Sequence, residues 1–208
     1  MIIDTHTHLD GIEFKDDIQD VVQRAKGVGV SKVFIPAIDL SSIKSINTVC
    51  QQFPDFAYPM IGLHPEEVKA NYKEILEKMK ETLLASSKYI AVGEVGLDFY
   101  WSREFEKEQL EAFEEQVKWS IETRLPLMIH CRKAQNEMVK ILKKYQSQLP
   151  GGVFHCFTGN EKEAAELLSF NNFVLGIGGV LTFKKSNLPE TLKSVSLQRI
   201  VLETDSPY

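Results

Sequence analysis

The sequence predicts an α/β protein in which short apolar β-strands alternate with longer amphipathic helices. Eight short apolar runs are spread along the chain, and several of the segments between them carry apolar residues at helical spacing. The length of 208 residues, with 43% hydrophobic and 25% charged residues, is ordinary for one globular domain. We therefore expect residues 1–208 to form a single domain.

The expected strands follow one another along the whole chain. They are residues 1–5, 32–38, 57–63, 89–95, 126–131, 152–157, 173–177 and 200–204. Strands this apolar are typical of parallel sheets that helices cover. The pattern leaves two architectures open, a closed parallel barrel and an open doubly wound sheet.

The segments between the strands predict helices that each bury one stripe. Two of these stripes consist of Ile18, Val21, Val22, Ala25 and Val28, and of Leu110, Phe113, Val117 and Ile121. Asn160 with Glu163 resembles a capped helix start, and the Asp39–Ser42 segment offers similar capping chemistry. The connections are therefore expected to be short.

Composition excludes several classes of protein. The net charge of −5 gives no basic field for gripping duplex nucleic acid, so any nucleic acid must be held locally. The three cysteines, Cys50, Cys131 and Cys156, show no CxxC spacing, which argues for a reducing compartment. The sequence shows no signal peptide and no membrane-spanning stretch. We expect a cytoplasmic protein that does not interact with membranes.

Residue types that commonly bind metals in proteins follow several of the apolar strands. Because strand side chains alternate, His6 and His8 point to one face and can chelate one ion, although two surface histidines are the simpler alternative. Four further strands end in Glu94, His130, His155 and Asp205. Burying such groups is costly unless a partner satisfies them, so together they favour a metal cluster.

Side-chain alternation indicates that these groups converge. The residues that share a face are Val92 with Glu94, Met128 with His130, and Val153 with His155. Four imidazoles and two carboxylates are too many for one tetrahedral ion, so the pattern predicts two ions bridged by a carboxylate and a water or hydroxide. Their spread over most strands favours a barrel over an open sheet.

Six segments, in order, resemble the motifs of the TatD deoxyribonuclease family. They are Asp4–His8, Gly62–Pro65, Val92–Tyr100, His130–Arg132, His155–Gly159 and Glu203–Tyr208. The resemblance covers the whole chain and implies a TIM-type (β/α)8 barrel of the amidohydrolase-like group. Family members usually continue beyond the last motif, so we expect a barrel that lacks the final C-terminal helix.

That ending predicts exposed outward residues on the last strand, Ile200 and Leu202. A shortened chain, a fragment and a chain that covers this face by self-association all fit the pattern. We expect a monomer or weak self-association.

The resemblance also implies the metal ligands. One ion is held by His6, His8, Glu94 and Asp205, and the other by Glu94, His130 and His155, which makes Glu94 the bridge. Magnesium, manganese, zinc, nickel and cobalt all suit such mixed ligands, so the sequence leaves the two divalent ions unidentified.

The implied activity is metal-dependent hydrolysis of phosphodiester bonds in DNA by a hydroxide that two metals activate. Glu94 and Asp205 are the expected catalytic residues, with Asp205 either a general base or a simple ligand. The acidic charge and narrow barrel mouth favour an exonuclease that acts on free ends over an endonuclease that grips long duplex. The resemblance implies the 3′–5′ direction and a preference for single strands.

Three residues are expected to contact the substrate. His64 can donate to a phosphate, with a purely structural histidine as the alternative. Arg132 offers a planar fork for phosphate, with a salt bridge as the alternative. Tyr100, between Phe99 and Trp101, lies in a loop where aromatic rings can stack on a nucleobase, with core packing as the alternative.

Four neighbouring residues receive other expectations. Cys131 and Cys156 have the opposite parity to the adjacent histidines, so we expect them to face the helices rather than a metal. Glu203 lies one step deeper than Asp205, where it can orient a ligand or form a structural salt bridge. For Asp98, orienting a ligand and capping a loop stay open.

Two other functions fit the same residues. A two-metal barrel can hydrolyse an amide, a lactone or a cyclic imide, although His64, Arg132 and the aromatic loop suit a phosphate and a base better. A metal-binding but inactive scaffold or regulatory partner is the alternative from outside enzymology.

Overall fold

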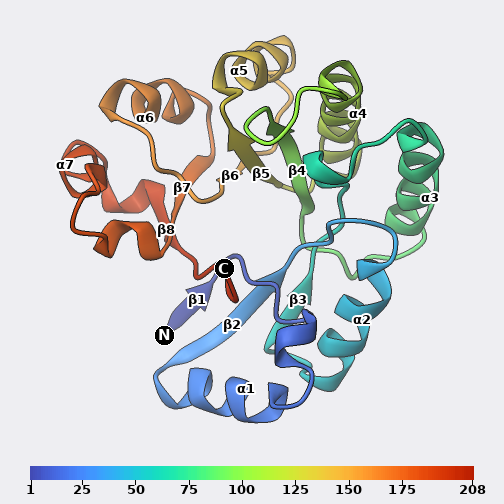
Figure 1. The fold of residues 1–208 in the computed structure, drawn as a ribbon, viewed down its shortest axis with the longest axis vertical. Coiled ribbons are helices and arrows are strands. Elements are labelled where there is room, and N and C mark those ends of the chain that lie inside the picture. Colours follow the sequence, from blue (N-terminus) through green and yellow to red (C-terminus); the bar gives the residue numbers. More distant parts are fainter.

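The computed structural model describes residues 1–208 and contains eight strands surrounded by helices (Figure 1). The strands are β1 (Ile2–Asp4), β2 (Val30–Ile35), β3 (Ala57–Pro59), β4 (Val92–Asp98), β5 (Leu127–Arg132), β6 (Gly152–Phe154), β7 (Phe173–Ile177) and β8 (Ile200–Leu202). All eight expected strands are present, and the strands that pair within each sheet are parallel. The α/β fold class is confirmed.

Helices occupy the connections between successive strands. The α-helices are α1 (Ile18–Gly27), α2 (Ser42–Gln52), α3 (Tyr72–Leu84), α4 (Glu106–Thr123), α5 (Gln135–Lys144), α6 (Glu161–Leu168) and α7 (Leu188–Leu192). Short 3-10 helices are η1 (Ile12–Phe14), η2 (Pro65–Glu67), η3 (Gly179–Thr182) and η4 (Leu197–Arg199). None of the helices combines the length and the apolar composition that crossing a membrane requires.

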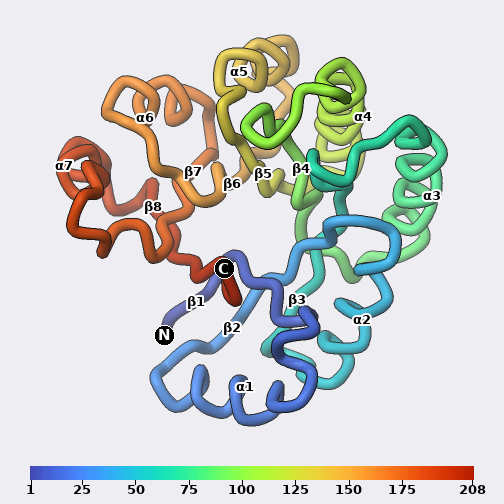
Figure 2. Tube along the Cα trace, viewed as in Figure 1, coloured from blue at the N-terminus to red at the C-terminus, as the bar shows by residue number.

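Backbone hydrogen bonds join two runs of strands. Strands β1 to β3 pair in one sheet and β4 to β8 in another. At one junction Gly93 N donates to Ile61 O at 2.9 Å, and at the other Thr5 N donates to Leu202 O at 3.0 Å. Figure 2 shows the chain passing round a common centre until its last residues lie beside its first. The strands are thus arranged as in a TIM-type (β/α)8 barrel.

The limits of β4 differ most from the expectation. This strand begins at Val92 and continues to Asp98, and its register against β5 shifts between Val92 and Val95. Such an irregularity interrupts the alternation of side chains. Val92 belongs to the large apolar cluster between the strands and the helices and does not share the inner face with Glu94, so the face expected for Val92 was wrong.

Most of the apolar core lies between the strands and the helices. The outer core contains 42 buried residues, whereas the inner cluster consists of Met60, Ala91 and Met128, with Val153 packed against it. Met128 and Val153 thus share the inner face with His130 and His155, as expected from the alternation along β5 and β6.

Capping groups set the starts of two helices. Asn160 Oδ1 accepts hydrogen bonds from Lys162 N at 2.9 Å and Glu163 N at 3.1 Å, while Glu163 accepts one from Asn160 N. This is the expected capping box of α6. Asp39 Oδ1 accepts a hydrogen bond from Ser42 N at 2.7 Å at the start of α2.

No helix follows β8 within residues 203–208. Leu202 is 54% exposed, as expected for an outward residue without cover. Ile200 is half-buried because it packs against the outer core, so the exposure expected for it was too large.

We predict that Phe173→Ala lowers the free energy of unfolding by about 3–5 kcal/mol. Phe173 is fully buried, and its ring centroid lies 4.9 Å from that of Phe154. Phe183→Ala is the matched control because Phe183 is 63% exposed, and its effect should stay below about 0.5 kcal/mol. Urea denaturation of both variants measures the difference, and equal losses would contradict this account of the core.

Candidate metal centre

Two imidazoles and two carboxylates meet at the carboxyl end of the barrel. His6 and His8 follow β1, Glu94 lies within β4, and Asp205 follows β8. The two histidines present their Nε2 atoms, which lie 3.3 Å apart. No lysine or arginine pairs with either carboxylate, so histidines are their only cationic partners.

The spacing of these four donor atoms fits a metal ion. His6 Nε2 lies 3.2 Å from Glu94 Oε2 and 3.6 Å from Asp205 Oδ1, and His8 Nε2 lies 3.8 Å and 3.5 Å from the same two oxygens. Zinc binds nitrogen and oxygen at about 2.0–2.2 Å, which places the corners of a tetrahedron about 3.4 Å apart. The donor set therefore has the dimensions of a divalent-ion site.

The second oxygen of Glu94 faces other imidazoles. Glu94 Oε1 lies 3.1 Å from His130 Nδ1, 3.4 Å from His64 Nε2 and 3.8 Å from His155 Nε2. One carboxylate thus separates two groups of nitrogen donors, with one oxygen turned to each. This is the arrangement that a bridging ligand requires.

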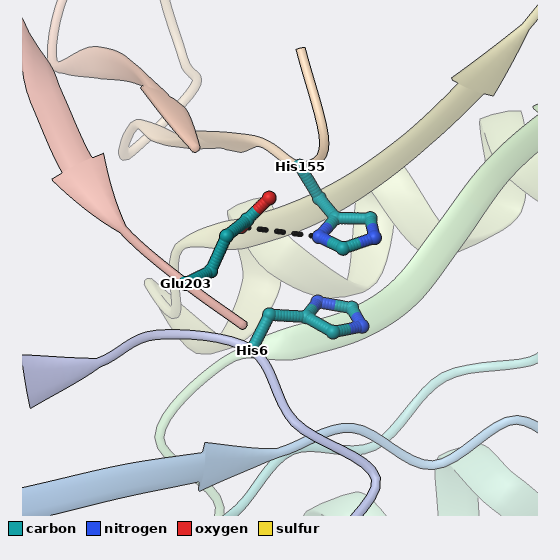
Figure 3. Close-up of side chains that lie close together, drawn as sticks. All are labelled: His6, His155 and Glu203. Carbon is teal, nitrogen blue, oxygen red and sulfur yellow. Dashed lines mark ion pairs between the residues drawn. The ribbon is translucent and has the colours of Figure 1, made fainter. Parts of the chain in front are cut away.

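Two buried carboxylates hold the far nitrogens of His130 and His155. Asp98 Oδ2 lies 2.8 Å from His130 Nε2, and Glu203 Oε2 lies 3.1 Å from His155 Nδ1 (Figure 3). Each contact favours a proton on the nitrogen that faces the carboxylate, which leaves the other nitrogen free to bind a metal. The free atoms are His130 Nδ1 and His155 Nε2, the two that face Glu94.

Glu203 is itself fixed deep in the barrel. Its Oε1 accepts a hydrogen bond from Cys156 N at 2.6 Å. A Cβ at Gly176 would lie 2.3 Å from Glu203 Oε2, so this glycine provides the space for the carboxylate. The ring of His6 stacks on the ring of His155 at a centroid distance of 3.5 Å (Figure 3). Of the two expected roles of Glu203, the geometry favours orienting His155.

His64 is turned so that it can donate. Glu66 N donates a hydrogen bond to His64 Nδ1 at 3.2 Å, at the start of η2. The hydrogen of this imidazole therefore sits on Nε2, which points toward Glu94. A protonated Nε2 suits hydrogen bonding to an oxygen and not metal ligation.

The electrostatics of the centre keep Glu94 ionised. Burial raises the pKa of Glu94, but His6, His64 and His130 outweigh burial and hold this pKa well below its usual range. Burial lowers the pKa of His6, and the neighbouring His155 lowers it further. An ionised carboxylate and a neutral imidazole are the forms that bind a cation.

The pKa values of Asp205 and His130 are shifted in opposite directions. Burial raises the pKa of Asp205, but the contact with His8 and the charge of His155 lower it below its usual value. Burial lowers the pKa of His130, but the hydrogen bonds to Asp98 and Glu94 raise it to about 9. The metal-free centre therefore contains ionised carboxylates around a protonated His130.

A cleft of about 720 Å³ opens over these residues. Seven of the nine predicted site residues line it, namely His8, His64, Glu94, His130, Arg132, His155 and Asp205. His6 is fully buried beneath it, and Tyr100 lies in the adjoining groove. The structure thus brings the predicted site residues to one end of the barrel.

The aromatic loop divides between core and surface. Phe99 is buried in the outer core, which is the core-packing alternative for this loop. Tyr100 and Trp101 are 50% and 65% exposed. The Arg132 guanidinium lies 3.9 Å from the Tyr100 ring centroid and forms no ion pair, which removes the salt-bridge alternative.

Contrary to the prediction from the alternation of strand side chains, Cys156 does not face the helices. Its Sγ lies within 4.8 Å of a His155 nitrogen and an Asp205 oxygen. Cys156 has a φ of 47°, and this left-handed backbone breaks the alternation that was assumed to continue past His155. Burial and the charge of Glu203 raise the pKa of this thiol to about 12. Cys131, in contrast, packs against the outer core as expected.

Asp4 supports the centre but was not singled out in the sequence. Its carboxylate accepts hydrogen bonds from Thr204 N at 3.0 Å, Thr204 Oγ1 at 2.6 Å and His6 N at 3.3 Å. It thereby ties the end of β1 to the segment after β8 and fixes His6 beside Asp205. The sequence offered two signals, an acidic residue inside an apolar strand and its place in the Asp4–His8 motif.

Fold and site together define a metal-dependent hydrolase built on a (β/α)8 barrel. A sequence model described as TatD related DNase matches residues 3–208. The chain belongs to this family.

Relatives of known name and structure agree with this assignment. The chain is 36% identical to the uncharacterized metal-dependent hydrolase YabD of Bacillus subtilis, covering 100% of this chain and 81% of that protein. It is 32% identical to the 3′-5′ ssDNA/RNA exonuclease TatD of Edwardsiella piscicida, covering 100% and 80%. The crystal structure of YJJV, a TatD homolog from Escherichia coli, superposes with a TM-score of 0.90 at 29% identity, covering 98% and 78%.

We predict that divalent metal raises the Tm of the metal-stripped protein and that Glu94→Gln abolishes most of this gain. At an ion concentration of about 100 times Kd, binding stabilises the folded state by about 2.7 kcal/mol. Glu67→Gln is the control because Glu67 is an exposed residue on the rim of the same cleft. Thermal unfolding with and without Mn²⁺ or Zn²⁺ provides the measurement. An equal metal-induced shift in both variants would refute the central position of Glu94.

We predict that Glu203→Gln and Asp98→Asn each weaken metal binding by about 10- to 100-fold. Each amide can still hydrogen-bond, but it no longer favours the metal-binding form of His155 or His130 through its charge. Competition with a fluorescent chelator measures the affinity. Affinities equal to that of the wild type would show that these carboxylates are structural only.

Proposed function

We propose that this protein hydrolyses phosphodiester bonds in DNA, as a 3′–5′ exonuclease on single strands or free ends, with two divalent metal ions. The observation that carries the proposal is the position of Glu94, whose two oxygens face two separate groups of histidines. The proposed direction of cutting is supported by the relative from Edwardsiella piscicida, which is named a 3′-5′ ssDNA/RNA exonuclease.

In this proposal His6, His8, Glu94 and Asp205 hold one ion, and Glu94, His130 and His155 hold the other. The ions, which can be magnesium, manganese, zinc, nickel or cobalt, supply Lewis-acid chemistry for activating water and neutralising phosphate charge. The chain contributes the fixed positions of its donors, because Asp98 and Glu203 orient two imidazoles before any ion binds.

Asp205 is the proposed proton acceptor. Its side chain is 27% exposed and lines the cleft, whereas Glu94 is almost fully buried. An ionised carboxylate at this position can accept the proton of the attacking water as well as hold a cation. A φ of 57° turns the backbone at Asp205, and its N–H donates to His6 O at 2.9 Å, which holds it in place.

His64, Arg132 and Tyr100 are the proposed substrate contacts. His64 Nε2–H can donate to a phosphoryl oxygen, because Glu66 N fixes the proton on that nitrogen. Arg132 has no carboxylate partner and can pair with the phosphate. The exposed rings of Tyr100 and Trp101 lie beside it, where they can stack on a base.

The deciding experiment is hydrolysis of labelled single-stranded DNA by the metal-stripped chain, with and without added Mg²⁺ or Mn²⁺. We expect metal-dependent cutting that Glu94→Ala lowers by at least about 1000-fold, because it removes ligands from both ions. Glu81→Ala is the matched control because Glu81 is exposed on α3 outside the cleft, and this variant should keep most of the activity. Metal binding without any cutting would contradict the nuclease proposal and favour another substrate or an inactive scaffold.

The position of the label tests the direction. With a 5′ label, a 3′–5′ exonuclease produces a ladder of shortening products, whereas a 3′ label appears at once as mononucleotide. Closed circular DNA offers no free end and should stay intact. Efficient nicking of the circle would rule out an enzyme restricted to ends.

A further inference from the structure

The metal-centre cleft continues into a groove over the ends of β5 and β6. This groove has a volume of about 850 Å³ and runs between the segments that begin α5 and α6. It shares Arg132, His155 and Thr158, among other residues, with the cleft. Because β5 and β6 are paired neighbours, these helices are successive members of the outer ring (Figure 1). A polymer that reaches the metal centre can therefore extend into the groove.

Cationic side chains line the groove. They are Arg103, Arg132, Lys133 and Lys162. Arg103 forms an ion pair with Glu106, with 2.7 Å between Arg103 Nε and Glu106 Oε2, but the other three cations form no ion pair. In a chain of net charge −5, three unpaired cations in one groove form a local site for an anion.

The acidic residues of the groove are partly occupied by other contacts. Glu163 accepts the Asn160 N–H of the α6 capping box. Glu166 accepts a hydrogen bond from Gln135 and lies 3.6 Å from Lys143. Glu137, in the first turn of α5, is the remaining acidic residue. Glu137 and Glu163 form no ion pair, so the three cations Arg132, Lys133 and Lys162 outnumber the unpaired carboxylates of the groove by one.

The opposite rim of the cleft has the reverse charge. Glu66 and Glu67 of η2 are exposed there, and neither carboxylate is held in an ion pair. A polyanion at the metal centre is repelled on this side and attracted on the side of β5 and β6. The charge distribution thus favours a strand path over β5 and β6 over a path across η2.

The backbone at Lys133 supports a binding role. Its φ of 58° is a left-handed conformation that residues with a Cβ rarely adopt, and it occurs directly after β5. Such conformations are concentrated at ligand sites. Lys133 lines the groove next to Arg132.

We propose that this groove holds the nucleotides next to the scissile bond, so that the strand passes from the metal centre over Arg132 and Lys133 toward Lys162. The proposal rests on the nuclease function proposed above and specifies the path of its substrate. Phosphates meet the cations, and the exposed ring of Tyr100, which also lines the groove, supports a base.

The test is the binding of a fluorescent oligothymidylate of about 12 nucleotides to the metal-stripped protein in EDTA, followed by anisotropy. We expect Lys133→Glu with Lys162→Glu to raise Kd at least about tenfold. Lys44→Glu is the control, because Lys44 is exposed on α2, forms no ion pair and lies outside both cavities. Its Kd should match that of the wild type.

Salt dependence gives an independent readout. Each phosphate contact to a single strand contributes about 0.7 to the slope of log Kd against log salt concentration. The slope of the double variant should therefore be smaller by about 1.4. An unchanged Kd and an unchanged slope in the double variant would overturn the proposal that the strand lies in this groove. Strand binding with the expected lysine dependence, but without metal-dependent cutting by the wild type, would refute the nuclease function and keep the groove as a nucleic-acid surface.

Discussion

The burial of the ionised Glu94 carboxylate is the constraint on which the rest of the site depends. Its side chain is 3% exposed, and removing such a charge from water costs several kcal/mol unless positive partners surround it. The chain provides no lysine or arginine here, only imidazoles from other strand ends. Only a barrel brings the ends of β1, β3, β4, β5 and β6 to one point, so the fold and the carboxylate explain each other.

The same balance explains why the centre suits divalent cations. Glu94, Asp98, Glu203 and Asp205 bring four carboxylates to imidazoles that are neutral in their metal-binding form. Asp98 and Glu203 polarise His130 and His155 from behind, so these two carboxylates add negative charge without occupying a ligand position. His64 differs because a backbone N–H occupies its Nδ1, which turns this histidine from a ligand into a donor.

Much of this could be predicted from sequence because it depends on local periodicity. The eight strands and the capping box of α6 follow from short-range patterns, and residues at strand ends converge in any parallel barrel. Predictions failed where the backbone is irregular. The register shift in β4 misplaced Val92, and the left-handed turn at Cys156 brought a thiol toward the site. Asp4 was missed because its partner Thr204 is 200 residues away.

The central claim is that Glu94 bridges two ions, and the number of ions bound per chain tests it most directly. Equilibrium dialysis of the metal-stripped protein against Mn²⁺, followed by elemental analysis, measures this number. The account predicts two ions per chain at saturation, because one oxygen of Glu94 faces His6 and His8 and the other faces His130 and His155. Saturation at one ion per chain would contradict it.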